Sequence, residues 1–125
     1  MIPSIICVIS ILAQTLLVNS QCLENYKECL EMNNLTIDDL KPYKYGDKLP
    51  EPQLCATKCA AKKLGALEPD GTIHFVKIEN HPEFIKFYNS DTKKCLSKLP
   101  KIVECVDMQV ALDCFADIGL SMDVC

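Results

Sequence analysis

The sequence predicts a small all-α domain that is cross-linked by disulfides and exported from the cell. Three observations support this fold class. Helix-forming segments follow one another along most of the chain, with short connections between them. The 125 residues include nine cysteines, about 7% of the chain, which is far more than a cytosolic enzyme carries. The chain also begins with an apolar segment of the kind that directs secretion.

The N-terminal segment is predicted to be a secretory signal peptide. The run from Ile5 to Val18 is apolar apart from three residues, and Ser20 offers a small residue for cleavage. Residues 1–20 would then be the signal peptide and 21–125 the mature domain. No Lys or Arg precedes the run, so an uncleaved anchor or a buried helix stays as the alternative. Fourteen helical residues span only about 21 Å, however, against a hydrocarbon core of roughly 30 Å, and we expect no membrane insertion after cleavage.

Cleavage after Ser20 removes Cys7 and leaves eight cysteines in the mature chain. An even number of cysteines in a secreted domain predicts a disulfide framework, here of four bridges. A domain of this size has a small hydrophobic core, which alone gives marginal stability. Disulfides that contribute roughly 2–4 kcal/mol each would supply most of the margin.

The first part of the mature chain carries two helix signals and a loop. Residues 23–32 are rich in Leu, Glu and Lys, which predicts a first helix. Thr36 and Asp39 match a capping box, which predicts a short second helix that ends at Pro42. Two prolines, a glycine and two tyrosines over residues 42–50 then indicate a loop.

The middle of the chain begins with the clearest helix signal. Pro52 suits a first helical position, residues 53–64 include three alanines, and Gly65 suits the C-terminal cap. The Pro-Asp-Gly sequence at 69–71 predicts a tight turn. Residues 72–78 include several β-branched residues and one aromatic residue. Their pattern fits either a short helix or a strand and does not decide between the two.

Two further helices are predicted in the last third. One opens at Pro82 and runs towards Cys95, and its continuity across residues 89–91 stays open. Pro100 ends it and introduces the last helix, over residues 101–117. Apolar residues populate every side of this last helix, so we expect neighbouring elements to enclose it. In total, the sequence predicts five or six helices with short connections between them.

Helical geometry constrains the disulfides without determining them. Cys55 and Cys59 are one turn apart and point to the same face of their helix, so each should bridge to another element. Cys105 and Cys114 are nine residues apart, about 13.5 Å along a helix axis and on opposite sides, so they cannot pair with each other. Many pairings of eight cysteines remain after these exclusions, and the connectivity stays open at this point.

The spacing of six cysteines resembles the signature of the insect odorant-binding protein family, also called pheromone/general odorant-binding proteins (PBP/GOBP). Three residues separate the second and third of them, eight separate the fifth and sixth, and the other gaps are long. The segment 63–67, leading into Asp70 and Gly71, also resembles the family, and the resemblance extends from about Leu23 to Ile118. The six are Cys29, Cys55, Cys59, Cys95, Cys105 and Cys114.

The resemblance implies a compact six-helix, disulfide-linked bundle that encloses an apolar cavity. It also implies an interlocked pairing, first with third, second with fifth and fourth with sixth: Cys29–Cys59, Cys55–Cys105 and Cys95–Cys114. Cys22 and Cys125 lie outside the six, and we expect them to pair and join the two ends of the mature chain, with intermolecular bonds or free thiols as alternatives. No proline follows Cys114, so the family's variant subgroup with additional cysteines is not matched.

The function implied by the resemblance is that of a secreted, extracellular carrier for small hydrophobic ligands such as odorants or pheromones, acting in insect olfaction. Tyr26, Tyr88 or His74 would orient a ligand through polar contacts. The candidate ligand-binding residues are Phe75, Ile78, Phe84, Phe87, Tyr88, Val106, Val110 and Phe115. The alternative interpretation of each apolar residue in this set is that it belongs to the hydrophobic core.

A second functional hypothesis uses the same scaffold without a small ligand. The chain would then be a secreted interaction protein of saliva, venom or reproductive fluid that binds a protein partner. A receptor or another protein is a conceivable partner under either hypothesis, and the chain is expected to be a monomer or a dimer.

Composition and motifs argue against other classes. All 13 basic residues are lysines, set against 17 acidic residues, which disfavours nucleic-acid binding. There are only two histidines, His74 and His81, and no nucleophile elbow, so we expect no enzyme. Oxidised cysteines do not ligate metals, and no metal or other cofactor is predicted. Asn34 and Thr36 form a glycosylation sequon, which predicts N-glycosylation of Asn34.

Overall fold

The computed structural model describes residues 26–81 and 88–118. Within these ranges the chain is helical, and its extended pairing is limited to one isolated antiparallel bridge between Leu67 and Ile73. The predicted all-α, disulfide-linked fold class is confirmed. The predicted signal peptide lies outside the described residues. None of the helices in the described ranges has the length and apolar character needed to cross a membrane.

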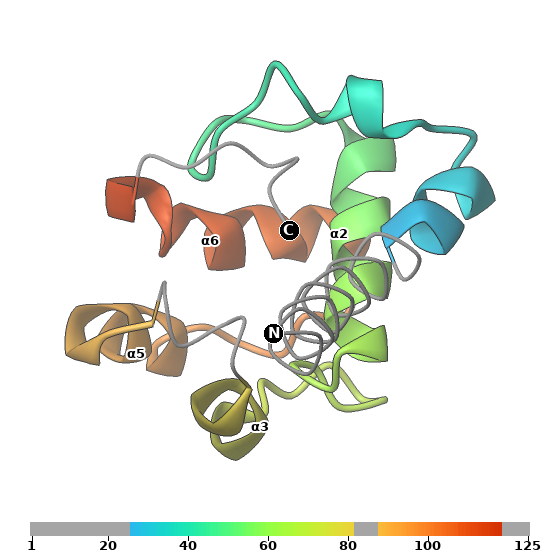
Figure 1. The fold of residues 1–125 in the computed structure, drawn as a ribbon. Coiled ribbons are helices and arrows are strands. Elements are labelled where there is room, and N and C mark those ends of the chain that lie inside the picture. The colour runs from blue at the N-terminus through green and yellow to red at the C-terminus, as the bar shows by residue number, and fades with distance from the viewer. Residues whose placement is uncertain (1–25, 82–87, 119–125) are drawn as a thin grey trace, which may run out of the picture.

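Helix α2 packs against α6 and η2, which follow one another near the C-terminal end of the described chain. In Figure 1 the helix 26–32 lies beside α2, α6 crosses α2, and α3 and α5 lie together on one side of these two. The elements are a helix over 26–32, the 3-10 turn η1 (Ile37–Asp39), α2 (Glu51–Lys63), α3 (Phe75–Asn80), α5 (Ser90–Ser97), η2 (Cys105–Asp107), α6 (Met108–Asp113) and η3 (Ala116–Ile118).

The short elements near the N-terminus agree with the sequence-based expectation. The Asp39 carboxylate accepts a hydrogen bond from the Thr36 N–H at 2.8 Å, as the capping box predicts. Pro50 caps α2 and Pro52 lies in its first turn. Beyond the last turn of α2, Gly65 has a φ of +82°, the left-handed conformation expected of a C-terminal glycine. The boundaries of α2 differ from the predicted 53–64 by one or two residues, a normal difference at helix ends.

Three disulfides connect these elements, and their pairing is the one that the family resemblance implies. They join the helix 26–32 to α2, α2 to η2, and α5 to the turn that follows α6. Their Cα–Cα distances of 5.6, 4.7 and 5.7 Å suit disulfide geometry. The pairing of Cys22 with Cys125 lies outside the described residues and stays a prediction. The three bridges are Cys29–Cys59, Cys55–Cys105 and Cys95–Cys114.

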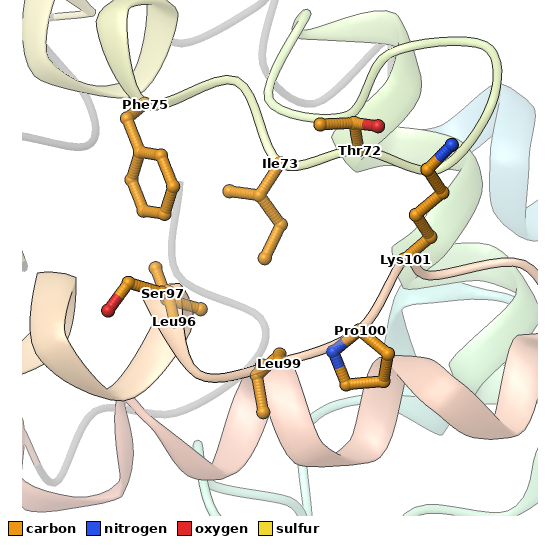
Figure 2. Close-up of a pocket in the computed structure, with 8 residues that line it drawn as sticks. All are labelled: Thr72, Ile73, Phe75, Leu96, Ser97, Leu99, Pro100 and Lys101. Carbon is orange, nitrogen blue, oxygen red and sulfur yellow. The ribbon is translucent and has the colours of Figure 1, made fainter.

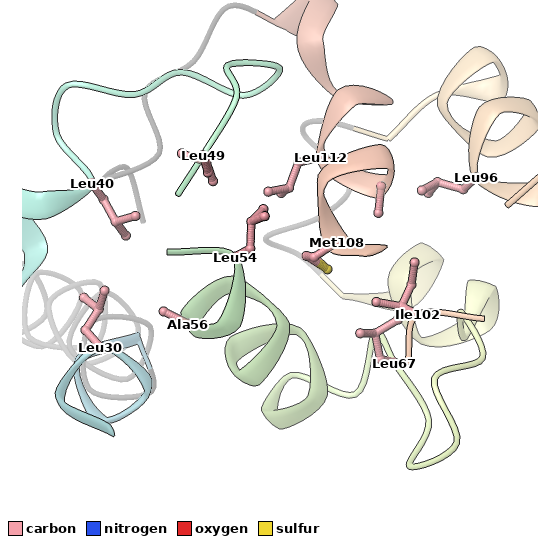
Figure 3. Packing of buried hydrophobic residues seen from close by; sticks show 11 residues of the cluster. Leu30, Leu40, Leu49, Leu54, Ala56, Leu67, Leu96, Ile102, Met108 and Leu112 are labelled. Carbon is pink, nitrogen blue, oxygen red and sulfur yellow. The ribbon is translucent and has the colours of Figure 1, made fainter. Parts of the chain in front are cut away.

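The core cluster is formed by apolar side chains of the helix 26–32, α2, α5 and α6, together with residues of the connecting segments. Figure 3 shows them gathered between α2, α6 and the helix 26–32, with Leu96 of α5 approaching from one side. Leu40 and Ile102 are fully buried although they lie outside regular helices. The cluster comprises Leu30, Leu40, Leu49, Leu54, Ala56, Leu67, Leu96, Ile102, Met108, Ala111 and Leu112.

The segment 72–78, which the sequence left open, is divided between two conformations. Ile73 pairs with Leu67 in the isolated bridge, and the chain turns helical two residues later. His74 caps this helix, because its Nδ1 accepts a hydrogen bond from the Lys77 N–H at 3.2 Å. The role of His74 in the described structure is therefore that of a helix cap.

Helix α5 has its own start. The Asn89 side chain accepts a hydrogen bond from the Thr92 N–H at 2.9 Å and so caps the helix at its N-terminus. A helix from Pro82 is therefore not continuous across residues 89–91. Residues 82–87 lie outside the described residues.

The prediction of one continuous helix over residues 101–117 is wrong. The chain is not helical at Ile102, whose N–H donates to the Gly71 carbonyl at 2.8 Å. Helical structure begins only at η2, where the Asp107 carboxylate accepts from the Glu104 N–H at 2.8 Å. A backbone bond to a distant turn thus replaces the first turns of the expected helix.

The expectation that neighbours enclose this segment on every side is also wrong. Val103, Val106 and Val110 are 57%, 54% and 44% exposed. Met108 and Leu112, which point to the other side, are buried. The segment therefore has one core face and one solvent face with three valines on it.

Candidate functional site

A pocket of about 150 Å³ lies between the N-terminus of α3, the C-terminus of α5 and the chain that follows α5. Figure 2 shows apolar side chains from these three segments facing a common space. Lys101 lies at one end of it and Ser97 at another. The lining residues are Thr72, Ile73, Phe75, Leu96, Ser97, Leu99, Pro100 and Lys101.

A tight turn brings the two sides of this pocket together. Gly71 adopts a φ of +93°, and its N–H donates to the Glu68 carbonyl at 2.9 Å. The Gly71 carbonyl in turn accepts from Ile102. Because Thr72 follows the turn and Lys101 precedes Ile102, this one backbone hydrogen bond holds the lining residues of the two segments opposite each other.

An ion pair reinforces the turn at the pocket's edge. The Asp70 carboxylate accepts from the Thr72 N–H at 2.9 Å and pairs with the Lys101 Nζ at 3.0 Å. Hydrogen bonds from Thr72, and then that from Lys101, lower the pKa of Asp70 to about 2. Asp70 is therefore ionised at any physiological pH, and it engages the cationic end of Lys101.

A second polar contact connects α3 with α5. The Glu79 carboxylate accepts from the Lys93 Nζ at 2.8 Å and from the Tyr88 hydroxyl at 3.1 Å. The Lys93 Nζ also lies 5.9 Å from the centre of the Phe75 ring. The hydrogen bond from Lys93, followed by that from Tyr88, lowers the pKa of Glu79, while burial and Glu79 raise the pKa of Tyr88 to about 12. This contact keeps Phe75 of α3 next to α5.

The α3–α5 contact should weaken in acid. The folded pKa of Glu79 lies below its ordinary value of 4.5, so its ionised form stabilises the fold above pH 4.5, and that contribution is lost as the pH falls through the lowered pKa. Glu79→Gln should therefore lower the thermal unfolding midpoint at pH 7 by about 2 °C, because the ion pair is exposed. The difference from wild type should disappear in acid. A Glu79→Gln deficit that persists at pH 2 would contradict the assignment.

The structure brings some of the predicted ligand-binding residues to the pocket and places others elsewhere. Phe75 lines the pocket, and Tyr88 contributes through Glu79 to the position of α3. Ile78, in the same helix, is buried. Phe84 and Phe87 lie outside the described residues.

The remaining predicted residues belong to the C-terminal segment and do not line this pocket. Val106 and Val110 are on the solvent face. Phe115 packs against the ring of Tyr45, with centroids 6.1 Å apart. Asn34, the predicted glycosylation site, is exposed in a turn with a φ of +58°, and its modification stays a prediction. Among the described residues, no three potential ligands cluster into a metal site.

Sequence reasoning missed most of the lining residues, because they become neighbours only through the bond between Gly71 and Ile102. Leu96, Leu99 and Pro100 were assigned to the end of a helix and its boundary. The turn at Pro69–Gly71 was recognised, but a local pattern does not reveal which distant segment pairs with it.

A small all-α domain with interlocked disulfides and an apolar pocket has the features of a ligand-binding scaffold. A model of the PBP/GOBP family matches residues 15–118, and the chain belongs to this family. The resemblance drawn from the cysteine spacing is thereby confirmed. Members of the family are secreted binding proteins rather than enzymes, and membership supports an odorant- or pheromone-binding carrier as the kind of function. No curated protein and no solved structure matches the chain significantly.

Proposed function

We propose that this protein is a secreted, non-enzymatic carrier that binds a small hydrophobic molecule, an odorant, pheromone or similar compound, in the pocket between α3 and α5. The observation that best supports this proposal is the apolar character of the residues that line the pocket. Five of the eight lining residues are apolar, namely Ile73, Phe75, Leu96, Leu99 and Pro100. A ligand that leaves water for such a surface gains about 25 cal/mol per Å² of apolar area buried.

The pocket volume limits what fits the described part of the site. A cavity of about 150 Å³ holds a molecule the size of benzene. A single ring or a short chain would therefore fill it, and a larger ligand would place one ring in the pocket and extend past its open mouth. Phe84 and Phe87, predicted to bind ligand, are kept in the proposal as further contacts. The proposal also includes cleavage of the signal peptide after Ser20 and a disulfide between Cys22 and Cys125.

Filling the pocket mouth should abolish binding. Ser97 is exposed at the C-terminal end of α5 and lines the pocket, so Ser97→Trp would place an indole over the opening. N-phenyl-1-naphthylamine is an apolar probe whose fluorescence should rise when it binds wild type saturably. Ethylbenzene should displace the bound probe and reverse this rise. The variant should bind the probe at least about tenfold more weakly.

Lys94→Trp is the matched control, because Lys94 is exposed on the same helix and does not line the pocket. It should bind the probe like wild type. Loss of binding in both variants, or in neither, would contradict the placement of the site. Folded wild type that binds no apolar probe would contradict the carrier function and favour the alternative, a secreted interaction protein that recognises a protein partner.

A further inference from the structure

Three exposed valines form an apolar surface on η2, α6 and the chain just before them. Val106 and Val110 are four residues apart in consecutive helical turns, which places them on one face, and Val103 lies one turn earlier. Met108 and Leu112, on the opposite side, point into the core (Figure 3). None of the three valines lines the pocket between α3 and α5. We call Val103, Val106 and Val110 the valine face.

The valine face is fixed to the rest of the fold. The Asp107 carboxylate accepts hydrogen bonds from the N–H groups of Val103, at 3.1 Å, and Glu104, at 2.8 Å. The Val103 carbonyl accepts a hydrogen bond from the Lys58 Nζ of α2, and a disulfide joins η2 to the same helix. Branched valine side chains also lose little rotamer freedom when a partner packs on them. The face is therefore preorganised for docking.

Opposite charges lie at the two ends of the valine face. The Lys58 ammonium is at the Val103 end, and it keeps two N–H donors after bonding the Val103 carbonyl. At the other end, Asp113 follows Val110 by three residues, and Asp117 follows one turn later in η3. Both aspartates are exposed. The face thus has a positive end, an apolar middle and a negative end.

These end charges are not compensated within the described part of the chain. None of Lys58, Asp113 and Asp117 is in an ion pair with another described residue. Asp113 only accepts a hydrogen bond from the neutral Gln109 amide, at 2.8 Å. The two carboxylates between the ends, by contrast, belong to the capping box of η2, where backbone N–H groups engage them.

A surface with this order of charges is complementary to itself. A two-fold axis through Val106 would make a second copy run antiparallel to the first, so that Val103 of one copy meets Val110 of the other. The same rotation sets Lys58 of each copy against the partner's Asp113 and the partner's Asp117. A second copy of the chain therefore satisfies both the apolar middle and the charged ends.

We propose that the valine face is the interface of a homodimer in which two copies pack antiparallel across Val106. A standard interface buries about 800 Å² per partner, more than three valines supply. The dimer is therefore weak and forms reversibly as the protein concentration rises. This inference goes beyond the proposed carrier function and does not depend on it, because the residues of the valine face do not line the pocket.

Analytical ultracentrifugation of the mature protein tests the proposal. The weight-average mass of wild type should rise towards twice the monomer mass between about 10 µM and about 1 mM, and it should fall again on dilution. Reversal on dilution distinguishes this dimer from one linked by a disulfide. Val106→Asp brings two carboxylates together at the two-fold axis, so it should weaken association at least about tenfold.

Val76→Asp is the matched control, because Val76 is an exposed valine of α3 and is not part of the valine face. This variant should dimerise like wild type. Both aspartates replace exposed side chains, so circular dichroism should give thermal unfolding midpoints within about 2 °C of the wild-type monomer.

A charge exchange tests the antiparallel arrangement. Lys58→Glu and Asp113→Lys each bring like charges together when the variant pairs with itself, so each variant alone should dimerise at least about tenfold more weakly than wild type. An equal mixture of the two can form a heterodimer in which both end contacts join opposite charges. The mixture should therefore recover association to within about threefold of wild type. If Lys58→Glu does not fold, Val106→Asp still decides whether the valine face is the interface.

Several outcomes would overturn the homodimer. Wild type that stays monomeric at about 1 mM, or Val106→Asp that dimerises like wild type, would show that the valine face is not an interface between copies. Monomeric wild type together with a lowered unfolding midpoint of Val106→Asp alone would show that other residues of the same chain cover the face. A mixture that associates no better than its components would contradict the antiparallel pairing. Binding of the naphthylamine probe, which reports on the carrier function, is measured separately in each case.

Discussion

Replacing Cys55 and Cys105 together by alanine is expected to lower the free energy of unfolding by about 4 kcal/mol. This bridge closes a span of 50 residues, the longest of the three described, and so restricts the unfolded chain most. It also connects α2 with η2, two elements that pack directly against each other. Small domains have only about 5–15 kcal/mol of stability in total, so a large share of the stability would be lost.

Urea unfolding followed by circular dichroism measures this loss. The matched variant replaces Cys95 and Cys114, whose bridge spans 19 residues, and it should lose about 3 kcal/mol. The Cys29–Cys59 bridge, which spans 30 residues, should fall between them. A reversed order would show that native packing around the bridges, and not the restriction of the unfolded chain, determines their contribution.

Gly71→Ala is the single substitution for which we expect the largest effect, a loss of about 3 kcal/mol. A Cβ at this position would lie 2.3 Å from the Ile102 carbonyl oxygen and 2.8 Å from the Ile102 carbonyl carbon. These are backbone atoms, which cannot move aside as a flexible side chain can. The residue also has a φ of +93°, which strains any residue with a Cβ. The substitution should separate the turn from the chain after α5 and break their hydrogen bond.

Because the same contact holds the pocket's two sides together, Gly71→Ala should also weaken binding of the naphthylamine probe. Gly65→Ala is the control, since Gly65 has a similar φ of +82° but its nearest neighbour is the flexible side chain of Lys77, at 3.2 Å. It should lose only about 1 kcal/mol and bind the probe like wild type. Thermal unfolding and probe titration of both variants measure the contrast. Equal effects would mean that backbone conformation alone, and not the approach to Ile102, makes Gly71 necessary.

Features encoded by local sequence could be predicted. The capping box at Thr36 and the helix predicted over residues 53–64 depend on residues within a few positions of one another, and both are found, the helix as α2 (Glu51–Lys63). The disulfide pairing followed from a resemblance between cysteine spacings, because helical geometry alone left many pairings open. Membership of the PBP/GOBP family agrees with that resemblance.

Features that depend on distant contacts could not be predicted. Residues 101–104 have the composition of a helix start, yet Ile102 bonds to Gly71, 31 positions earlier in the chain. The valines at 106 and 110 look like core residues by type, but burial depends on what packs against them, and nothing in the described structure covers that face fully. The pocket could not be predicted for the same reason, because its lining residues come from segments that only the tertiary structure brings together.

The overlap of the three bridges has a consequence for a protein in a fluid that contains proteases. The spans closed by Cys29–Cys59, Cys55–Cys105 and Cys95–Cys114 overlap, so together they cover every peptide bond between Cys29 and Cys114. One cut anywhere in that stretch leaves both pieces covalently attached. The segments that form the pocket all lie inside it, so a nicked molecule still carries all eight lining residues.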